Sequence, residues 1–242
     1  MGRVILFVLM FLSAVGVHAQ RVPYTKEFNE LQCALATCFL EFEQDPLPAD
    51  TTAAWLRWKT VSNYAFGKNR GNLLMIADVD ALHPHFRELV KTLIAQCKAK
   101  GITLAVVESY RTRAKQNEYR AMGKKYTRSA GGSSKHQYGL AVDVVPMVDA
   151  VAVWDNLALW RKVGTTGEKL GLRWGGRWRH PFDPGHFEWT QGLSAHQLAQ
   201  GIFPQLNAKQ DTTGIQHELQ RLSAYWKAWE AEQATVARQT QR

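Results

Sequence analysis

The sequence has no long run of like charges, no internal repeat and no long apolar run after its first twenty residues. The missing charge runs exclude a basic arm of the kind that binds nucleic acid, so no nucleic-acid partner is expected. The net charge of +9 is spread along the chain and suggests an acidic polymer as a general partner; a generic basic soluble protein is the simpler alternative. With 242 residues, 45% of them hydrophobic, the composition indicates one globular domain with additions at its ends.

Cysteine is scarce, with only Cys33, Cys38 and Cys97. If residues 27–43 form a helix, Cys33 and Cys38 project about 140° apart and do not easily bond to each other. One of them could pair with Cys97, which would leave an odd thiol. Small buried thiols are the simpler interpretation, and the disulfide state stays open.

The N-terminus has one basic residue, Arg3, followed by an apolar run over residues 4–17. This run is shorter than the roughly 20 residues that a membrane-spanning helix needs. Residues 17–19, Val-His-Ala, resemble a signal-peptide cleavage site, so we predict a signal peptide over residues 1–19 and a secreted or periplasmic protein with no stable membrane span. An uncleaved signal anchor is the alternative. No cysteine follows the run, so no lipid attachment is expected there.

Two short stretches carry the chemistry: S-K-H-Q-Y-G-L-A-V-D at residues 134–143 and D-P-G-H-F-E-W at residues 183–189. They offer two imidazoles and one carboxylate, from His136, Asp143 and His186. Zinc binds such nitrogen and oxygen donors, and three protein ligands leave a fourth position open for water, as in catalytic sites. Asp183 lies three residues before His186, where a loop entering a strand can aim it at that water.

These stretches are similar to the VanY-like zinc peptidases of bacterial cell walls. The family pattern S-x-H-x-x-G-x-A-x-D is met in full by residues 134–143, and its later acidic-x-x-H element by Asp183 and His186. The resemblance extends upstream to S-Y-R-T at residues 109–112, and downstream through G-L-R-W-G-G-R-W at residues 171–178. It covers roughly the middle half of the chain. The family includes D-alanyl-D-alanine carboxypeptidases, vancomycin-resistance dipeptidases and L-alanyl-D-glutamate endopeptidases.

The resemblance implies a role for each matching residue. One zinc ion per chain is held by His136, Asp143 and His186. Asp183 is the general base, and Arg111 steadies the substrate or the developing oxyanion. The expected substrate-binding residues are Tyr110, Gln116, Ser134 and Trp178, and Trp174 is also expected near the site. Glu188 is a rival base, but a residue two positions after a ligand in a strand shares that ligand's face, so we give it a supporting role.

The fold that the resemblance implies is α+β: a small antiparallel sheet flanked by helices, with the zinc site in a cleft on the sheet, as in the hedgehog and D-Ala-D-Ala peptidase-like folds. We divide the rest of the chain into an N-terminal helical extension at 20–75, a zinc peptidase domain at 76–205 and a C-terminal helical tail at 206–242, and expect a monomer.

The spacing of apolar residues and the residues that typically start or end helices predict individual elements within this domain. Helices are expected at about 84–100, 114–122, 157–170 and 194–200, and strands at about 102–110 and 140–145. His83 and His85 flank a proline and are interpreted as a solvated helix start. The tail from Gly214 carries an apolar stripe broken at Gln233, which predicts a helix docked on the catalytic domain.

Three functions remain open from the sequence. The first is an L-alanyl-D-glutamate endopeptidase acting on peptidoglycan stem peptides, which W-G-G-R-W and D-P-G-H-F favour. The second is a D-alanyl-D-alanine carboxypeptidase, which needs a pocket for a terminal carboxylate. The third is a non-catalytic, zinc-containing module that binds the cell wall. The presence of Asp183 and Arg111 weighs against the third.

Overall fold

The computed structural model of the protein describes residues 58–62, 64–206 and 212–240. The chain divides into two units, 1–48 and 49–242, and the described residues all lie in the second. The predicted signal peptide, most of the predicted N-terminal extension, Cys33 and Cys38 therefore lie outside the described residues. Among the residues that are described, no helix combines the length and the hydropathy needed to span a membrane.

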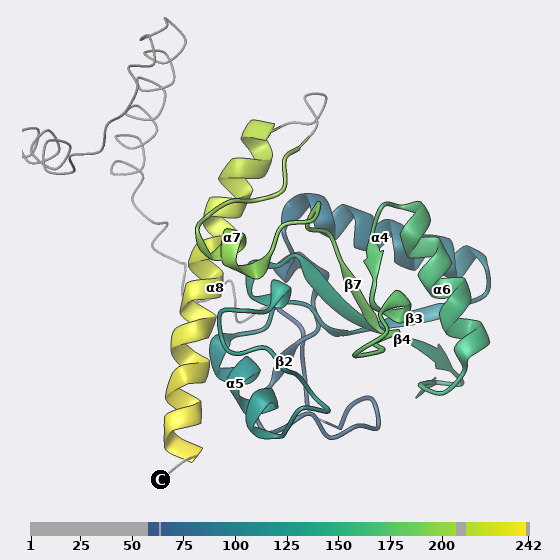
Figure 1. Ribbon diagram of the computed structural model, residues 1–242, viewed down its shortest axis with the longest axis horizontal. Helices are drawn as coiled ribbons and strands as arrows, with labels where there is room; N and C mark the ends of the chain where they lie inside the picture. Colours follow the sequence, from purple (N-terminus) through teal and green to yellow (C-terminus); the bar gives the residue numbers. More distant parts are fainter. Residues whose placement is uncertain (1–57, 63, 207–211, 241–242) are drawn as a thin grey trace, which may run out of the picture. The chain divides into compact units, whose positions relative to one another are not determined.

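Figure 1 shows short strands and helices around one central sheet. In chain order the elements are β1 (Thr60–Val61), β2 (Met75–Ile76), η2 (Val79–Ala81), α4 (Pro84–Ala99), β3 (Thr103–Glu108), α5 (Arg113–Ala121), η3 (Lys135–Tyr138), β4 (Ala141–Val148), β5 (Val151–Ala152), α6 (Leu157–Lys169), β6 (Arg173–Trp174), η4 (Gly175–Arg177), β7 (His186–Glu188), α7 (Ala195–Ala199) and α8 (Thr212–Thr240).

The main sheet is antiparallel, with strand order β3-β4-β7-β6, and β5 pairs with the end of β4. Its register brings distant parts of the sequence to one point: Asp143 on β4 lies opposite Glu108 on β3 and opposite His186 on β7. β4 is thus paired on both sides, and it contains the strand expected at about residues 140–145. The predicted α+β fold, with a small antiparallel sheet and flanking helices, is confirmed.

The sheet has a core face and a site face. Val142 and Val144 on β4 and Phe187 on β7 are fully buried in the core, where α4 and α6 pack on each other and on the sheet. Alternation along the strands sends the neighbouring Asp143 and His186 to the opposite face. On α6, Gly167 allows close packing, because a Cβ there would clash with the Phe187 ring.

The predicted helices and strands occur within a few residues of their expected bounds. The solvated start expected at His83 is wrong. This side chain is only 3% exposed, and its ring packs against Trp189 and Phe203. Burial, together with the charges of His85 and Arg87, lowers the pKa of His83 to about 4. The histidine belongs to the interior because the α4 start lies beneath the segments that follow β7.

The predicted start of the catalytic domain at residue 76 falls inside β2, which pairs with β1 at residues 60–61. The described part of the predicted helical extension therefore contains a strand and a loop, and that loop includes Gly67 and Gly71 at positive φ. Glycine populates this backbone region at little steric cost. Residues 58–75 are part of the folded body.

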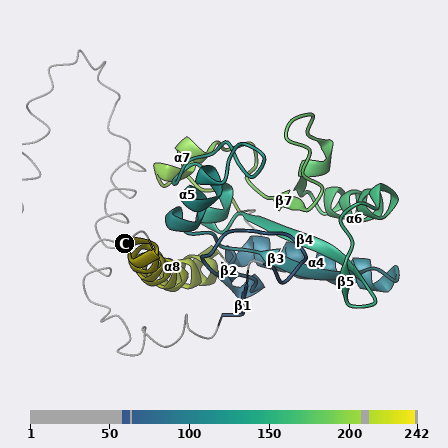
Figure 2. The same ribbon diagram turned by 90° about the horizontal axis from the view of Figure 1, so that it is seen from below.

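The tail forms the long helix α8, which Figures 1 and 2 show lying beside α5. Its apolar stripe is buried through Leu222, Trp226 and Trp229. Gln233, which interrupts the stripe, is also buried: it accepts a hydrogen bond from the Thr112 hydroxyl and donates one to the Leu74 carbonyl. A polar residue fits within the stripe because both of its amide atoms have partners.

Candidate metal centre

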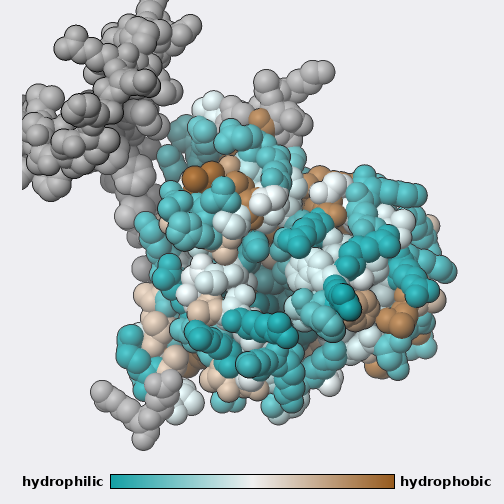
Figure 3. All heavy atoms as spheres, viewed as in Figure 1, coloured by the Kyte–Doolittle hydropathy of each residue, from teal (hydrophilic) through white to brown (hydrophobic). Residues whose placement is uncertain are grey.

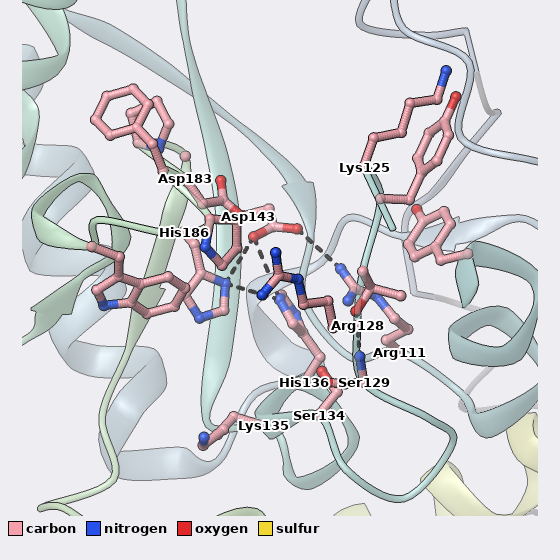
Figure 4. Close-up of a pocket in the computed structure, with 18 of the residues that line it drawn as sticks. Arg111, Lys125, Arg128, Ser129, Ser134, Lys135, His136, Asp143, Asp183 and His186 are labelled. Carbon is pink, nitrogen blue, oxygen red and sulfur yellow. Dashed lines mark hydrogen bonds and ion pairs between the residues drawn. The ribbon is translucent and has the colours of Figure 1, made fainter. Parts of the chain in front are cut away.

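Three donor atoms from three elements converge on the site face of the sheet (Figure 4). Asp143 Oδ1 lies 3.1 Å from His186 Nδ1 and 3.4 Å from His136 Nε2, and the two ring nitrogens lie 3.3 Å apart. A tetrahedral ion about 2.0–2.1 Å from each donor needs them roughly 3.3 Å apart. The spacing therefore fits zinc, and the three residues form a possible metal-binding group, as the sequence predicts.

Each histidine is oriented by a second hydrogen bond. Nδ1 of His136 donates to the Ser109 carbonyl at 2.8 Å, which leaves Nε2 with its lone pair toward the site. Nε2 of His186 donates to Glu188 at 3.2 Å, so Nδ1 is the ring atom that faces Asp143 and the site. Glu188 is held in turn by Arg173 at 2.7 Å. Such outer partners fix the tautomer and the ring orientation of a metal ligand, which agrees with the supporting role predicted for Glu188.

The electrostatics of the group favour a bound cation. Burial alone would raise the pKa of Asp143, but His136, His186 and Arg111 outweigh it and hold that pKa well below its usual range. Burial alone would lower the pKa of His186, whereas Asp143 and Glu188 raise it to about 10. The site therefore stabilises positive charge at His186, and a metal ion would compete with the proton for its Nδ1.

Arg111 lies behind Asp143 and also lines the cavity. Its guanidinium donates to Asp143 Oδ2 at 3.0 Å and to Glu108 Oε2 at 2.6 and 2.9 Å. Its third guanidinium nitrogen donates to Gln116 at 3.1 Å. The arginine thus holds the outer oxygen of a metal ligand, and Gln116 is buried beneath the arginine instead of lining the cavity.

Tyr110 is not where a substrate-binding residue is expected. It does not line the cavity; its ring stacks on Trp226 with centroids 4.9 Å apart, and its hydroxyl donates to Glu230 at 3.1 Å. The neighbouring residues in β3 and its loop alternate in direction, so Arg111 faces the site while Tyr110 faces α8. Tyr110 therefore supports the site from outside.

A cavity of about 1190 Å³ opens onto the metal donors and is lined by Ser134, Trp178 and Asp183. Figure 4 shows Asp183 and His186 on one side of Asp143, and Arg111 on the other. Burial and the nearby Asp143 carboxylate raise the pKa of Asp183. A carboxyl with a raised pKa in the same cavity as the donor group is suited to proton transfer.

The W-G-G-R-W segment divides between site and core. The Trp178 ring lies 5.1 Å from the His186 ring, whereas Trp174 is buried in the core and donates to the Pro184 carbonyl. Gly175 does not make room for a substrate, because a Cβ there would clash with the Asp183 carbonyl oxygen. The glycine instead lets the loop of Asp183 approach η4 closely.

A further wall of the cavity, built by Lys68, Arg70 and Trp154, was not predicted from the sequence. Arg70 Nη1 lies 3.9 Å from Asp143 Oδ2. These residues come from loops whose spacing follows no helix or strand period, so no pattern could have revealed them. Figure 3 shows hydrophilic side chains gathered around a hollow near the middle of the described body.

A buried His-Asp-His donor group that opens on a cleft beside a further carboxylate defines a mononuclear metal centre of the hydrolytic type. Residues 127–189 match a family model described as D-alanyl-D-alanine carboxypeptidase. Over 121 residues the chain is 31% identical to the peptidoglycan L-alanyl-D-glutamate endopeptidase CwlK of Bacillus subtilis strain 168, covering 44% of this chain and 72% of that protein. The chain belongs to the VanY-like zinc peptidase family, and it is a zinc-dependent peptidase.

Solved structures similar to this chain include the L-Ala D-Glu endopeptidase ChiX of Serratia marcescens, at 25% identity and a TM-score of 0.39, over 46% of this chain and 83% of that one. They also include the vancomycin-resistance D,D-pentapeptidase VanY of a VanB-type cassette, in complex with Zn(II), at 19% identity and a TM-score of 0.34, over 73% of this chain and 94% of that one.

Proposed function

We propose that the protein is an exported, monomeric zinc metallopeptidase that hydrolyses amide bonds in peptidoglycan stem peptides, as an L-alanyl-D-glutamate endopeptidase. The main support for this proposal is that one cavity is lined by the candidate metal donors His136, Asp143 and His186 and by the Asp183 carboxyl. The bond assignment is supported by the similarity to CwlK. Export rests on the signal peptide predicted at residues 1–19, and the proposed peptidase domain comprises the predicted residues 76–205 together with residues 58–75, which supply β1 and part of the cavity wall.

The mechanism divides among the residues of the cavity. A zinc ion, when bound, lowers the pKa of its water toward neutrality and polarises the amide carbonyl. Asp183 accepts the proton of the attacking water and then delivers it to the departing amine. Burial and the Asp143 carboxylate raise its pKa, which favours uptake of the proton from the attacking water.

Arg111 contributes by holding Asp143 in place, and its position at the cavity wall supports a contact with the substrate carbonyl. A preorganised donor to a developing oxyanion contributes on the order of 3 kcal/mol to catalysis. Ser134 and Trp178 line the cavity beside the donor group and bound the space in which the stem peptide lies.

A D-alanyl-D-alanine carboxypeptidase is the second candidate. It needs cationic groups near the metal to bind the terminal carboxylate, and the cavity offers Lys68 and Arg70. A non-catalytic wall-binding module is not retained, because the family membership and the placement of Asp183 both indicate an enzyme.

The test is a digest of purified peptidoglycan and of synthetic stem peptides by the zinc-loaded protein, with a chelated control and products identified by mass spectrometry. We expect chelator-sensitive cleavage between L-alanine and D-glutamate. Release of only the terminal D-alanine would show that the protein is a carboxypeptidase. The absence of cleavage at either bond would overturn the proposed function.

A further inference from the structure

Lys68 and Arg70, on the loop after β1, both lie over the ring of Trp154 at the wall of the cavity. The Lys68 ammonium lies 3.8 Å from the Trp154 ring centroid, and the Arg70 guanidinium carbon lies 5.4 Å from it. All three side chains line the same cavity as the metal donors. The ring attracts both cations, but each of these contacts is a weak interaction that does not neutralise their charge.

Within the described part of the chain, these two cations lack an anion of their own. Lys68 has no carboxylate there within 4.0 Å, and the one such carboxylate near Arg70 is Asp143 at 3.9 Å, which Arg111 already holds at 3.0 Å. Nε of Arg70 is buried and has no hydrogen-bond partner. Burial and the charge of Arg70 lower the pKa of Lys68, and the Asp183 carboxylate partly opposes this shift. Holding two partly buried like charges together is costly unless an anion joins them.

The loop that carries the two cations is nevertheless fixed. The Lys115 ammonium donates to the Arg70 and Leu73 carbonyls, and Glu118 accepts from the backbone N–H groups of Asn72 and Leu73. At the other end of the loop, Trp154 Nε1 donates to a backbone carbonyl at 2.8 Å. The backbone is thus anchored on both sides of the cations. Among the described residues, their charged ends face only carboxylates that belong to the metal centre, which is an arrangement suited to a ligand.

Basic residues also outnumber acids over the rest of the cavity wall. Its other basic residues are Arg111, Lys124, Lys125, Arg128, Lys135, Arg173 and Arg179. The acids on the wall are Asp143, Asp183 and Glu188, and all three serve the metal centre. The wall therefore attracts an anionic ligand and offers it no carboxylate outside the metal centre as a competitor.

We propose that Lys68 and Arg70, held on Trp154, form a carboxylate-binding subsite that orients the substrate beside the metal centre. This inference rests on the proposed function and names the feature of the peptide that the site recognises. A guanidinium presents two parallel donors to a carboxylate, and an ammonium beside it adds a second charge. Because Arg70 approaches the outer oxygen of Asp143, the carboxylate recognised belongs to a residue next to the scissile amide.

A stem peptide has two sources for such a carboxylate. One is the free α-carboxylate of a glutamate linked through its side chain, and the other is the carboxylate at the chain end. The endopeptidase function requires the first, and the carboxypeptidase function the second. Two matched peptide pairs separate them: one pair carries the α-carboxylate or its amide, and the other carries the terminal carboxylate or its amide.

Calorimetry measures the binding of all four peptides to the zinc-loaded Asp183→Asn protein. Steady-state kinetics then give KM and kcat for the same peptides with the protein that retains Asp183. We expect one acid to bind at least ~10-fold more tightly than its amide, since a charge-assisted contact is lost in the amide. Arg70→Gln and Lys68→Gln should each reduce this ratio severalfold by raising KM for the acid, and Arg70→Lys should restore part of it. Arg161→Gln, an exposed arginine on α6 that does not line the cavity, should leave the ratio unchanged.

An acid-to-amide ratio that stays unchanged in both Arg70→Gln and Lys68→Gln would overturn the subsite, because the metal or another group would then bind the carboxylate. Lys68→Gln provides this result even if Arg70→Gln does not fold, since the Lys68 ammonium contacts the Trp154 ring and does not anchor the loop backbone. Failure of the proposed function is distinct: none of the peptides would be cleaved by the unmodified protein, whatever its binding ratio.

Discussion

The cavity has two kinds of wall, and they differ in how their charged groups are partnered. On the metal wall, His136 and His186 each have an outer hydrogen-bond acceptor, and Asp143 is held by Arg111. On the other wall, Lys68 and Arg70 lie over an indole without a carboxylate of their own among the described residues. Chemistry needs donors that are fixed before the reaction begins, whereas recognition needs charges that a ligand can still satisfy.

Asp183→Asn should have the largest effect, because it removes the proton acceptor and leaves the metal donors in place. We expect kcat to fall by on the order of 10²–10⁴-fold, the range for a general acid–base residue. Metal analysis should still find zinc bound to the variant. Retained activity would show that the base lies elsewhere, with Glu188 as the next carboxylate to test.

Trp226→Ala tests whether the two walls are independent, because Trp226 lies outside the cavity on α8, which supports the metal wall. The indole stacks on Tyr110, donates to the Ala81 carbonyl at 2.9 Å and covers Gly139, where a Cβ would lie 2.5 Å from the ring. Truncating such a buried tryptophan costs about 3–5 kcal/mol of folding free energy.

Chemical denaturation measures that loss. In the fraction that remains folded, zinc affinity and kcat should decline, while the preference for peptide acid over amide should persist. The exposed α8 residue Val236, substituted by alanine, is the matched control and should change stability little. A lost acid preference in Trp226→Ala would mean that the two walls are not independent.

Glu188→Gln should weaken zinc binding about 10–100-fold, as the loss of an outer hydrogen-bond partner of a metal ligand typically does. The amide still reaches His186, but it no longer provides a negative charge behind the ring. A competition titration with a chelating dye measures the change. Activity at saturating zinc should recover most of its original value, and a permanent loss of kcat would instead support Glu188 as the base.

Zinc affinity should depend on pH because of His186. Its pKa in the metal-free protein is raised to about 10 by Asp143 and Glu188, against burial, so the ring carries a proton at neutral pH. Zinc needs the neutral ring, so binding at about pH 7–9 should release about one proton, and affinity should rise with pH until about pH 10. Calorimetry in two buffers of different ionisation enthalpy counts the proton. A zinc affinity that does not change as the pH rises above neutral would contradict the raised pKa of His186.

Prediction from the sequence agrees with the structure where residues follow a short pattern. The three candidate metal donors lie together, as expected from their fixed positions in two short motifs, and the strand expected at about 140–145 occurs as part of β4. Prediction failed where a side chain's surroundings come from distant segments: Tyr110 faces α8, and His83 is buried beneath residues far along the chain. Lys68 and Arg70 lie on an irregular loop, and only the folded chain brings them to the metal donors.

The most direct test of the account is a crystal structure of the zinc-loaded protein, with anomalous diffraction measured on both sides of the zinc absorption edge. We predict one anomalous peak per chain, about 2.0–2.2 Å from His136 Nε2, Asp143 Oδ1 and His186 Nδ1, with Asp183 outside the coordination shell. A peak elsewhere, or coordination by Asp183 in place of one of these three residues, would contradict the division between metal donors and proton acceptor on which the proposed mechanism depends.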